Sequence, residues 1–571
     1  MKKILVKSLS ILAVCSLSAG CIKETFPEGA TQLGSQVSES SFALEGILRG
    51  LPSAMMSTGW SGYYKTYGWH TDFGIGAIHL YTEFMLNDLA TMGDEPLYNR
   101  FYQSAMNSGQ DSRYAVTAFY WDCYYKWIKI ANDLVAVVNP ETANDVQKGY
   151  LGQALAYRAM FYLDLARLYN AKPVTDPYAV GKGYVVADNL KNLTVPIVTE
   201  SISEDVARNN PRATLEAMYE FILTDLDNAE KYLKDKAFNY TAPSLVAVYG
   251  LKARAYLEMG YWAEGAASKQ AFENAIANAK LAIESGDRTP LTKAQWQDPV
   301  NGFNNGAANN SWIWGQTLSA ENQSNIITYT AHISSEASWG YSSLSQIGAD
   351  RKFYERINDS DFRKASWLAP EFVENPNDPA FANVYQFAGG TAGRDNFLKG
   401  TSETPPAKPY ENIKFRPAQG ETSNYNVGNC ADHCLMRIEE MYFIIAEATA
   451  HTKGLAAGKT ELDSFINTYR DPEFHSSANT LENFLVDDLL FQKRIEFWGE
   501  GLLIYDYKRV NGGIERGYDG TNQAGQYRFN CKGRSPQWNI VITRGEFQSN
   551  LGITDATNNP DPTDMIAPWL E

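Results

Sequence analysis

The chain has 571 residues, with 66 acidic and 50 basic side chains and a formal net charge of −16. This length allows several structural units around a large core, and the acidic balance excludes nucleic-acid binding, which needs clustered lysine and arginine. Aromatic side chains make up 13% of the residues. That share is typical of surfaces that stack on sugars or peptides, and also of the cores of large helical solenoids.

The amino-terminal segment has the pattern of a secretory signal peptide. An apolar stretch, Leu9 to Leu17, follows several lysines and is too short to span a bilayer. Small residues, Ala19 and Gly20, come directly before Cys21, an order that resembles a bacterial lipobox. We therefore expect residues 1–20 to be a lipoprotein signal peptide and Cys21 to carry lipid. The alternative is an ordinary secreted protein in which Cys21 is an unmodified thiol.

A short polar segment follows and leads into long helical patterns. Residues 21–40 are rich in Gly, Pro and Ser and predict a flexible tether. Residues 41–288 predict a helical scaffold, with early aromatic loops. Within it, Asn210 and Pro211 look like a helix start, since apolar residues then recur at three- and four-residue steps to Leu233. Similar apolar faces predict helices at about 113–138, 151–169, 244–260 and 270–284.

The sequence from Val246 to Gly286 looks like a tetratricopeptide unit, with small residues where two helices cross and aromatic residues between them. Short polar joints between the predicted helices imply antiparallel neighbours. The repeat is irregular elsewhere. These features predict a helical superhelix rather than a perfect solenoid.

The pattern changes between residues 289 and 429, where Gly, Asn, Pro and aromatic residues carry only short strand or helix signals. Helical patterns return between Leu435 and Ile445, and again from Leu481 to about Lys508. We therefore predict that 289–429 is a loop-rich lobe inserted into the helical body, and that 430–571 holds the C-terminal helices and a tail.

Aromatic residues in loop segments are the candidates for ligand contact, because C–H faces of sugars stack on rings while polar groups fix the hydroxyls. Trp312 and Trp314 share one face if their segment is a strand, and we expect both to pack inward. Trp69 and Trp339 are the first choices as ring platforms. The full set of candidate ligand-binding residues is Trp60, Tyr67, Trp69, His70, Asp72, Trp296, Trp339 and Tyr341.

Known catalytic and metal-binding motifs are not matched. The glycines between His451 and Thr460 are too close for a phosphate-binding loop, so Gly454 is expected to end a helix. Cys430 and Cys434 lack a second tight pair of ligands, which favours disulfides or reduced thiols over zinc. No cofactor is expected. A pair of carboxylates for glycoside hydrolysis stays an open alternative, because any two acids about 5–10 Å apart could serve.

Six segments occur together in a characteristic order. They are FYWDCYYKWIKIANDLVAVV (119–138), QALAYRAMFYLDLARLYNAKP (153–173), LTVPIVTE (193–200), AMYEFILTDLDNAEKYL (217–233), LMRIEEMYFIIAEA (435–448) and QKRIEFWGEGLLIYDYKR (492–509). This order resembles the SusD/RagB family of bacterial surface nutrient-binding lipoproteins, over essentially the whole mature chain. The last run is the most specific, since it is similar to the family's Arg-x-Glu-x-x-x-Glu-Gly-x-x-x-x-Asp-x-x-Arg pattern.

The resemblance implies an all-α dominated, tetratricopeptide-like superhelix (the SusD-like fold) with an inserted loop-rich, ligand-binding lobe. In that fold Arg494, Glu496, Glu500 and Asp506 are expected to be paired buried charges rather than catalytic groups.

The same resemblance implies a function without catalysis. The expected protein is a lipid-anchored, cell-surface glycan-binding protein of the outer membrane that passes an oligosaccharide or polysaccharide to a SusC-like TonB-dependent transporter. The alternatives are a peptide-binding member of the family, a surface glycoside hydrolase, and a scaffold or adhesin that binds only protein.

Overall fold

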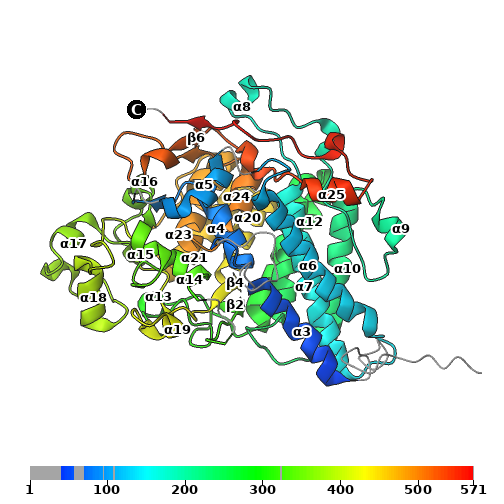
Figure 1. Ribbon diagram of the computed structural model, residues 1–571, viewed down its shortest axis with the longest axis horizontal. Coiled ribbons are helices and arrows are strands. Elements are labelled where there is room, and N and C mark those ends of the chain that lie inside the picture. Colours follow the sequence, from blue (N-terminus) through cyan, green and yellow to red (C-terminus); the bar gives the residue numbers. More distant parts are fainter. Residues whose placement is uncertain (1–39, 57–69, 94–95, 107–109, 322–324, 570–571) are drawn as a thin grey trace, which may run out of the picture.

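Long helices occupy one side of the molecule and short elements the other (Figure 1). This computed structural model describes residues 40–56, 70–93, 96–106, 110–321 and 325–569. Its strands form only small sheets of two or three strands within the described residues. The predicted all-α fold class is confirmed.

Seven long helices form a continuous stack, in which each packs against the next in chain order. They are α6 (Ala115–Val137), α7 (Asp145–Tyr169), α10 (Leu215–Leu233), α11 (Leu245–Trp262), α12 (Gly265–Ser285), α20 (Glu439–Lys453) and α21 (Leu455–Tyr469). The helix α3 (Ser41–Met56) packs on α6 and α7. Residues 286–438 separate α12 from α20 in the sequence, but the two helices pack directly against each other. The stack of long helices is therefore continuous in space.

Side-chain caps fix where the long helices begin and end. Asn144 accepts hydrogen bonds from the backbone of Val146 and Gln147, so α7 starts earlier than the apolar pattern predicted. The helix α20 ends at Lys453 with Gly454 as its C-cap, as expected.

The predicted start of α10 at Asn210 and Pro211 is wrong. The segment before the helix is extended, and the backbone of Ala213 exchanges hydrogen bonds with Thr194 and Val195, at 2.8 and 3.1 Å. The helix begins only at Leu215, where the Thr214 hydroxyl accepts a hydrogen bond from the backbone of Ala217. Pairing with a distant segment overrides the local start signal.

The short elements of the lobe carry few residues each. They are α13 (Lys293–Gln297), β2 (Trp312–Gln316), α14 (Tyr329–Ile333), α15 (Tyr341–Ser345), β3 (Ile347–Ala349), α16 (Arg351–Glu355), η4 (Phe362–Ser366), α17 (Pro370–Glu374), η5 (Pro379–Phe381), α18 (Gly390–Lys399), η6 (Ala418–Gly420) and α19 (Tyr425–Gly428). Figure 1 places α17 and α18 at the outer edge, away from α6, α7 and α10.

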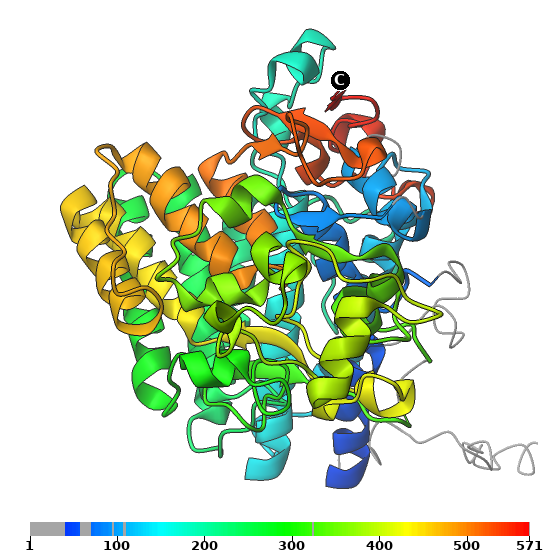
Figure 2. The same cartoon turned by 90° about the vertical axis from the view of Figure 1, so that its left-hand side faces the viewer.

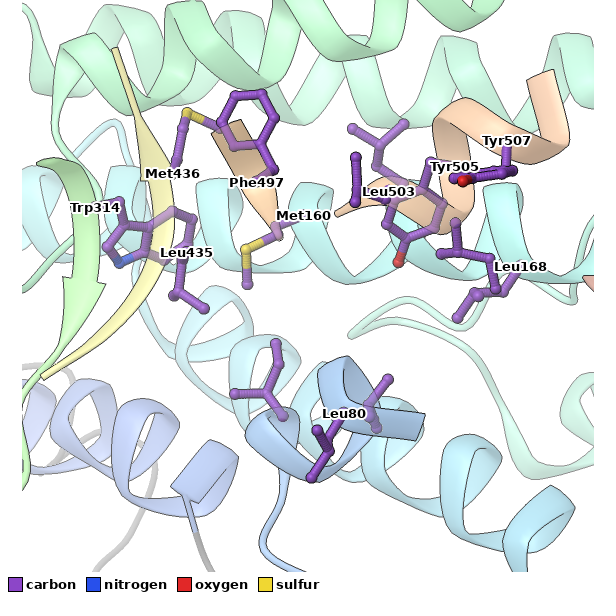
Figure 3. Packing of buried hydrophobic residues seen from close by; sticks show 14 of the residues in the cluster. Leu80, Met160, Leu168, Trp314, Leu435, Met436, Phe497, Leu503, Tyr505 and Tyr507 are labelled. Atoms are coloured by element: carbon purple, nitrogen blue, oxygen red, sulfur yellow. The ribbon is translucent and has the colours of Figure 1, made fainter. Parts of the chain in front are cut away.

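Two antiparallel strand pairs join these short elements to the rest of the chain. β1 (Leu89–Thr91) pairs with β3, and β2 pairs with β4 (His433–Arg437). Trp312 and Trp314 of β2 are both fully buried, so the prediction that they pack inward is confirmed. Figure 3 shows Trp314 beside Leu435, in a core that also contains residues of the C-terminal helices.

Other short elements cover the ends of the stack. They are α4 (Ile75–Phe84), η2 (Pro96–Tyr98), α5 (Asn99–Met106), α8 (Pro177–Gly181), η3 (Asp188–Leu190), α9 (Glu204–Ala207), β5 (Ile514–Glu515), η8 (Gly525–Tyr527), β6 (Phe529–Cys531), η9 (Pro536–Trp538), α25 (Arg544–Ser549), η10 (Asp555–Thr557) and β7 (Ala567–Pro568). The strands β5, β6 and β7 make one antiparallel sheet. In Figure 2 this sheet lies at the top, beside the carboxyl end of the chain.

The C-terminal helical pattern is interrupted where the sequence predicted a single helical region. It consists of α22 (Leu481–Asn483), the π-helical turn η7 (Phe484–Leu489), α23 (Leu490–Phe497) and α24 (Leu503–Val510). Between α23 and α24 the chain turns sharply through Gly499 and Gly501, whose φ angles are 75° and 76°. This turn places Glu500 in the interior, where it is 3% exposed.

A buried ionic network ties the lobe to the helical stack. Glu496 accepts hydrogen bonds from Arg363, Arg437 and Arg470 at 2.6 to 2.8 Å. Glu500 accepts from Lys414 at 2.7 Å and from Arg437 at 2.9 Å. Arg363 and Lys414 belong to the lobe, so the carboxylates of the C-terminal helical region are paired with cations of the lobe.

Arg494, Glu496, Glu500 and Asp506 of the most specific motif are therefore paired in the fold, as expected. Arg494 pairs with Asp88 at 2.5 Å rather than with Glu500. Asp506 bonds to Lys493 at 2.7 Å and also to Arg509. Glu447 of α20 joins the same group through Lys493 and Arg509.

Cys430, Cys434 and Cys531 are free thiols in the structure. Among the residues with described coordinates, no His, Cys, Asp and Glu side chains gather in a group that could hold a metal ion. In the same part of the chain, none of the helices combines the length and the apolar character that crossing a membrane requires.

Candidate functional site

The structure brings together His70 and Tyr341, two candidates 271 positions apart. The Tyr341 hydroxyl and Nδ1 of His70 are hydrogen-bonded, and the two rings meet edge to face with centroids 5.7 Å apart. His70 is exposed. Three other candidates, Trp60, Tyr67 and Trp69, lie outside the described residues, and so does Cys21; their roles stay predictions.

Tyr341 is the outer ring of a buried stack. Its ring lies on His332 with centroids 4.2 Å apart, and His332 lies on Phe73 at 4.5 Å. Burial lowers the pKa of His332 to about 3, so its imidazole is neutral, and Nδ1 donates to the Thr328 carbonyl at 2.7 Å. One face of Tyr341 is covered by this stack and the ring is only 9% exposed. Tyr341 therefore offers an edge and its hydroxyl, not an open platform.

Trp339 lies two residues before Tyr341 and is half-buried. Its ring packs against Gly428, where an added Cβ would lie 2.9 Å from Cζ2 of the indole. The indole N–H is buried and has no hydrogen-bond partner among the described residues. The close approach to Gly428 holds the ring in place while part of it stays accessible.

Trp296 is a structural residue, which corrects the expectation that it contacts ligand. It is 4% exposed, and its indole N–H donates to the Ser366 hydroxyl at 2.8 Å. Lys414, Arg437 and Arg470 lie 5.2 to 5.5 Å from its ring centroid, as in cation–π contacts. The ring has no free face, because it covers the buried ionic network.

Asp72 is also below the surface, with 2% exposure. Together with burial, its charge raises the pKa of Tyr81. Such burial does not support a direct contact between a ligand and this carboxylate. The expectation that Asp72 contacts ligand is therefore corrected.

A polar cavity of about 260 Å³ lies in the lobe, and residues close to Trp339 and Tyr341 in the sequence contribute to its wall. Ser338 and Ser343, which flank the two aromatic residues in the sequence, both line it. The other lining residues are Ser335, Glu336, Gly393, Asn396, Phe397, Thr401, Ser402, Glu403, Thr404, Pro405, Glu411, Thr422 and Ser423. Ser338 donates to the Thr422 carbonyl through both its backbone N–H and its hydroxyl, at 2.9 and 2.8 Å, which fixes one wall.

Two buried carboxyl groups of this cavity differ in their surroundings. Glu336 is paired with Arg416 and also accepts a hydrogen bond from the backbone of Ala388 at 2.8 Å. Burial raises the pKa of Glu411 to about 8, although hydrogen bonds from Lys408 and Gln346 oppose the shift. At neutral pH Glu411 is therefore largely protonated, so this one carboxyl group of the cavity is neutral and can donate a hydrogen bond.

Sequence reasoning missed Glu336, Glu411 and Thr422. A usable signal was the density of serine between Ala331 and Ser345, around Trp339 and Tyr341. Glu411 and Thr422 gave no such signal, because they reach the cavity only through the folding of the lobe. A second and larger cavity, lined in part by Tyr354, Tyr385 and Tyr410, lies elsewhere in the lobe.

The fold and the site together define a helical scaffold that carries a cavity with a polar lining. Such a concave site with convergent polar groups is typical of small-molecule recognition.

Comparison with known proteins agrees with this class. Residues 80–257 match the family model SusD-like_3, described as starch-binding associating with outer membrane. SusD-like protein P2 of Formosa agariphila is 23% identical over 450 residues, which cover 76% of this chain and 79% of that protein. These two matches show that the chain is similar to SusD-like proteins, over residues 80–257 for the family model and over 76% of its length for the relative.

Solved structures share the fold. A SusD-like carbohydrate binding protein from Bacteroides vulgatus superposes with a TM-score of 0.64 at 20% identity, covering 90% of this chain and 97% of the other. Surface glycan-binding protein A from Bacteroides thetaiotaomicron, in complex with laminarihexaose, gives a TM-score of 0.61 at 14% identity, with 90% and 98% covered.

Proposed function

We propose that this protein is a non-enzymatic glycan-binding protein that holds an oligosaccharide at the polar cavity, against Trp339, Tyr341 and His70. The observation that carries the proposal is the cavity itself, whose lining combines the ring of Phe397 with hydroxyl, amide and carboxyl groups and includes Ser338 and Ser343, which flank Trp339 and Tyr341 in the sequence. Sugars need both kinds of group, because their C–H faces stack on rings and their hydroxyls form hydrogen bonds. The starch-binding description of the matching family model supports the same ligand class, as does the laminarihexaose complex of a relative.

Binding rather than hydrolysis fits the carboxyl groups of the cavity. Both oxygens of Glu336 are engaged, one by Arg416 and the other by the Ala388 backbone. A glycosidase needs one carboxyl group as acid and a second as base or nucleophile. Glu411 is suited to donate a hydrogen bond, while Glu336 is held by its partners. Release of reducing ends from a polysaccharide panel would contradict this reading and favour the surface glycoside hydrolase.

Replacing Trp339 by Ala should weaken glycan binding about fivefold or more, because ring stacking contributes on the order of 1 kcal/mol beyond burial. Affinity electrophoresis on a polysaccharide panel would identify the ligand first. Isothermal titration would then compare the variant with the wild type, and circular dichroism would verify folding. The control is Tyr178→Ala, which removes a ring that is 37% exposed on α8. Unchanged affinity in the Trp339 variant would move the site elsewhere.

The proposal includes attachment to the outer membrane through Cys21 and delivery of glycan to a SusC-like TonB-dependent transporter, with the binding face toward the cell exterior. The family description, which places its members with the outer membrane, supports this location. The peptide-binding alternative predicts that peptides, not glycans, would be retained in the same assays.

Replacing Cys21 by Ala should move the protein from the membrane fraction to the soluble fraction, because a lipobox cysteine is the attachment point of the lipid. Fatty-acid labelling of the protein should disappear at the same time. Cys15→Ala is the matched control, since it removes the other cysteine of this segment and should leave labelling intact. Labelling that persists without Cys21 would contradict the anchor.

A further inference from the structure

A cavity larger than the polar cavity lies outside the site proposed above. It measures about 580 Å³, within the range of about 300–1,000 Å³ that is usual for small-molecule sites. Its walls come from α13, α16, η4, α17 and η5, with Tyr410. We propose that this tyrosine cavity is a second glycan-binding site, which takes a short stretch of a neutral oligosaccharide. The ligand class rests on the proposed function; the location does not.

Aromatic rings on two sides give the cavity its character. Tyr354 and Tyr410 meet with centroids 5.1 Å apart at 63°, while Phe381 and Tyr385 are stacked at 6.1 Å and 30°. Tyr410, Tyr385 and Phe381 are half-buried, so each has ring surface left for a ligand. The Tyr385 hydroxyl accepts from the backbone of Ala369 at 2.9 Å and donates to the Trp367 carbonyl at 3.3 Å. These bonds fix the ring, as a stacking surface requires.

The polar groups at the opening favour a neutral ligand. Lys293, Glu371 and Asn383 are exposed residues of the lining. Lys364 is paired with Asp359 at 2.7 Å. The lining also holds two further carboxylates, Glu355 and Asp361, which are paired with Arg351 and Arg363. Apart from these pairs, an ammonium group, a carboxylate and an amide lie around the opening. This mixture can donate to and accept from sugar hydroxyls, whereas a strongly ionic ligand would meet a like charge.

A fixed segment separates the tyrosine cavity from the polar cavity. Tyr410 lines the first and the next residue, Glu411, lines the second. The Tyr410 N–H donates to the Leu368 carbonyl at 2.7 Å, and the Leu368 N–H donates to the Glu411 carbonyl at 3.0 Å. The backbone of Ala349 holds the Tyr410 carbonyl from the other side at 2.9 Å. The two sites therefore share one wall and can be emptied separately by substitution.

The backbone of Tyr410 supports a functional reading of this wall. Its φ is 68°, a left-handed value that is uncommon for a bulky residue. The surrounding hydrogen bonds hold this conformation, which directs the ring to the tyrosine cavity and leaves Glu411 at the polar cavity. Strain of this kind gathers at ligand sites.

The test is isothermal titration of the full chain with a panel of trisaccharides and hexasaccharides that includes maltotriose, maltohexaose and laminarihexaose. Two variants empty the tyrosine cavity: Phe381→Ala removes a ring, and Asn383→Ala changes only an exposed amide and so keeps the test valid if the first variant unfolds. Trp339→Ala disables the polar cavity, and Tyr178→Ala is the aromatic control. Thermal melting verifies the folding of each.

We expect the wild type to bind two trisaccharide molecules, and Phe381→Ala to bind one. Asn383→Ala should weaken trisaccharide binding at the tyrosine cavity at least threefold, while Trp339→Ala should retain binding there. If the affinity is unchanged in Phe381→Ala and Asn383→Ala but falls in Trp339→Ala, the second site is overturned and the proposed function stands. If the affinity falls only in Phe381→Ala and Asn383→Ala, the tyrosine cavity is supported as a glycan site and the polar cavity is rejected as one. Absence of binding to every glycan overturns both, and so does retention of peptides alone.

Discussion

Replacing Glu496 by Ala should lower the free energy of unfolding by about 3–5 kcal/mol or more, because breaking a buried ion pair leaves its partner charged and desolvated. Here three guanidinium groups, those of Arg363, Arg437 and Arg470, lose one shared partner. All four side chains are fully buried, so water cannot replace the lost carboxylate. Urea denaturation at neutral pH measures the loss.

The control for Glu496 is Glu515→Ala, in an exposed pair with Lys352 whose loss should cost at most about 1 kcal/mol. The pH dependence gives a second check. Burial alone would raise the pKa of Glu496, but Arg470, Arg437 and Arg363 lower it well below 4.5. Its contribution to stability is therefore present above about pH 4.5 and is lost as the pH falls toward the folded-state pKa. The difference between wild type and variant should shrink from pH 7 to pH 3; equal differences would contradict the assignment.

The second large effect is expected from Gly501→Ala, in the turn between α23 and α24. Gly501 has a φ of 76°, and an added Cβ would lie 2.3 Å from Cβ and 2.6 Å from Cα of His79 in α4. Since helix backbone cannot yield like a flexible side chain, overpacking should cost about 1–3 kcal/mol, and the left-handed conformation roughly 1–2 kcal/mol more. Thermal denaturation should show the same loss of stability as a lower Tm.

Gly265→Ala separates these two contributions. Gly265 also has a positive φ, 54°, but nothing lies within 4 Å of the position of its Cβ. Its replacement should cost only the conformational part, about 1–2 kcal/mol. Equal destabilisation of the two variants would mean that the contact with His79 is relieved by movement of α4.

Local pattern was sufficient for much of the helical body, and the reason is physical. The apolar faces of α6, α10 and α11 repeat at the helical period, so their existence follows from burial of one side. Their boundaries depended on interactions beyond the local pattern, as at Thr214, where a strand-like contact with residues 192–195 delays the helix. The superhelix was predicted from the tetratricopeptide-like unit and the short joints, whereas the role of Glu496 came from the family resemblance.

The site was harder to predict because exposure is decided by partners far away in sequence. Trp296 has a loop-like neighbourhood, yet the cations of the buried network enclose it. Tyr341 is hydrogen-bonded to His70, another candidate far away in the sequence, but its stacking on His332 hides most of its ring. The sequence contains no local sign that Asp88 partners Arg494 or that Glu411 reaches a cavity.

The contact between α12 and α20 has an evolutionary consequence. The lobe leaves and re-enters the stack at neighbouring points, since the backbone of Leu291 donates to Glu439, the first residue of α20, at 2.8 Å. Insertions and deletions in such a lobe leave the helical register unchanged, so recognition can diversify while the scaffold is inherited. Two positions of the lobe, however, restrict which lobes can be exchanged between relatives. A lobe transplanted from a relative must bring cations equivalent to Arg363 and Lys414, or the host carboxylates of Glu496 and Glu500 lose partners.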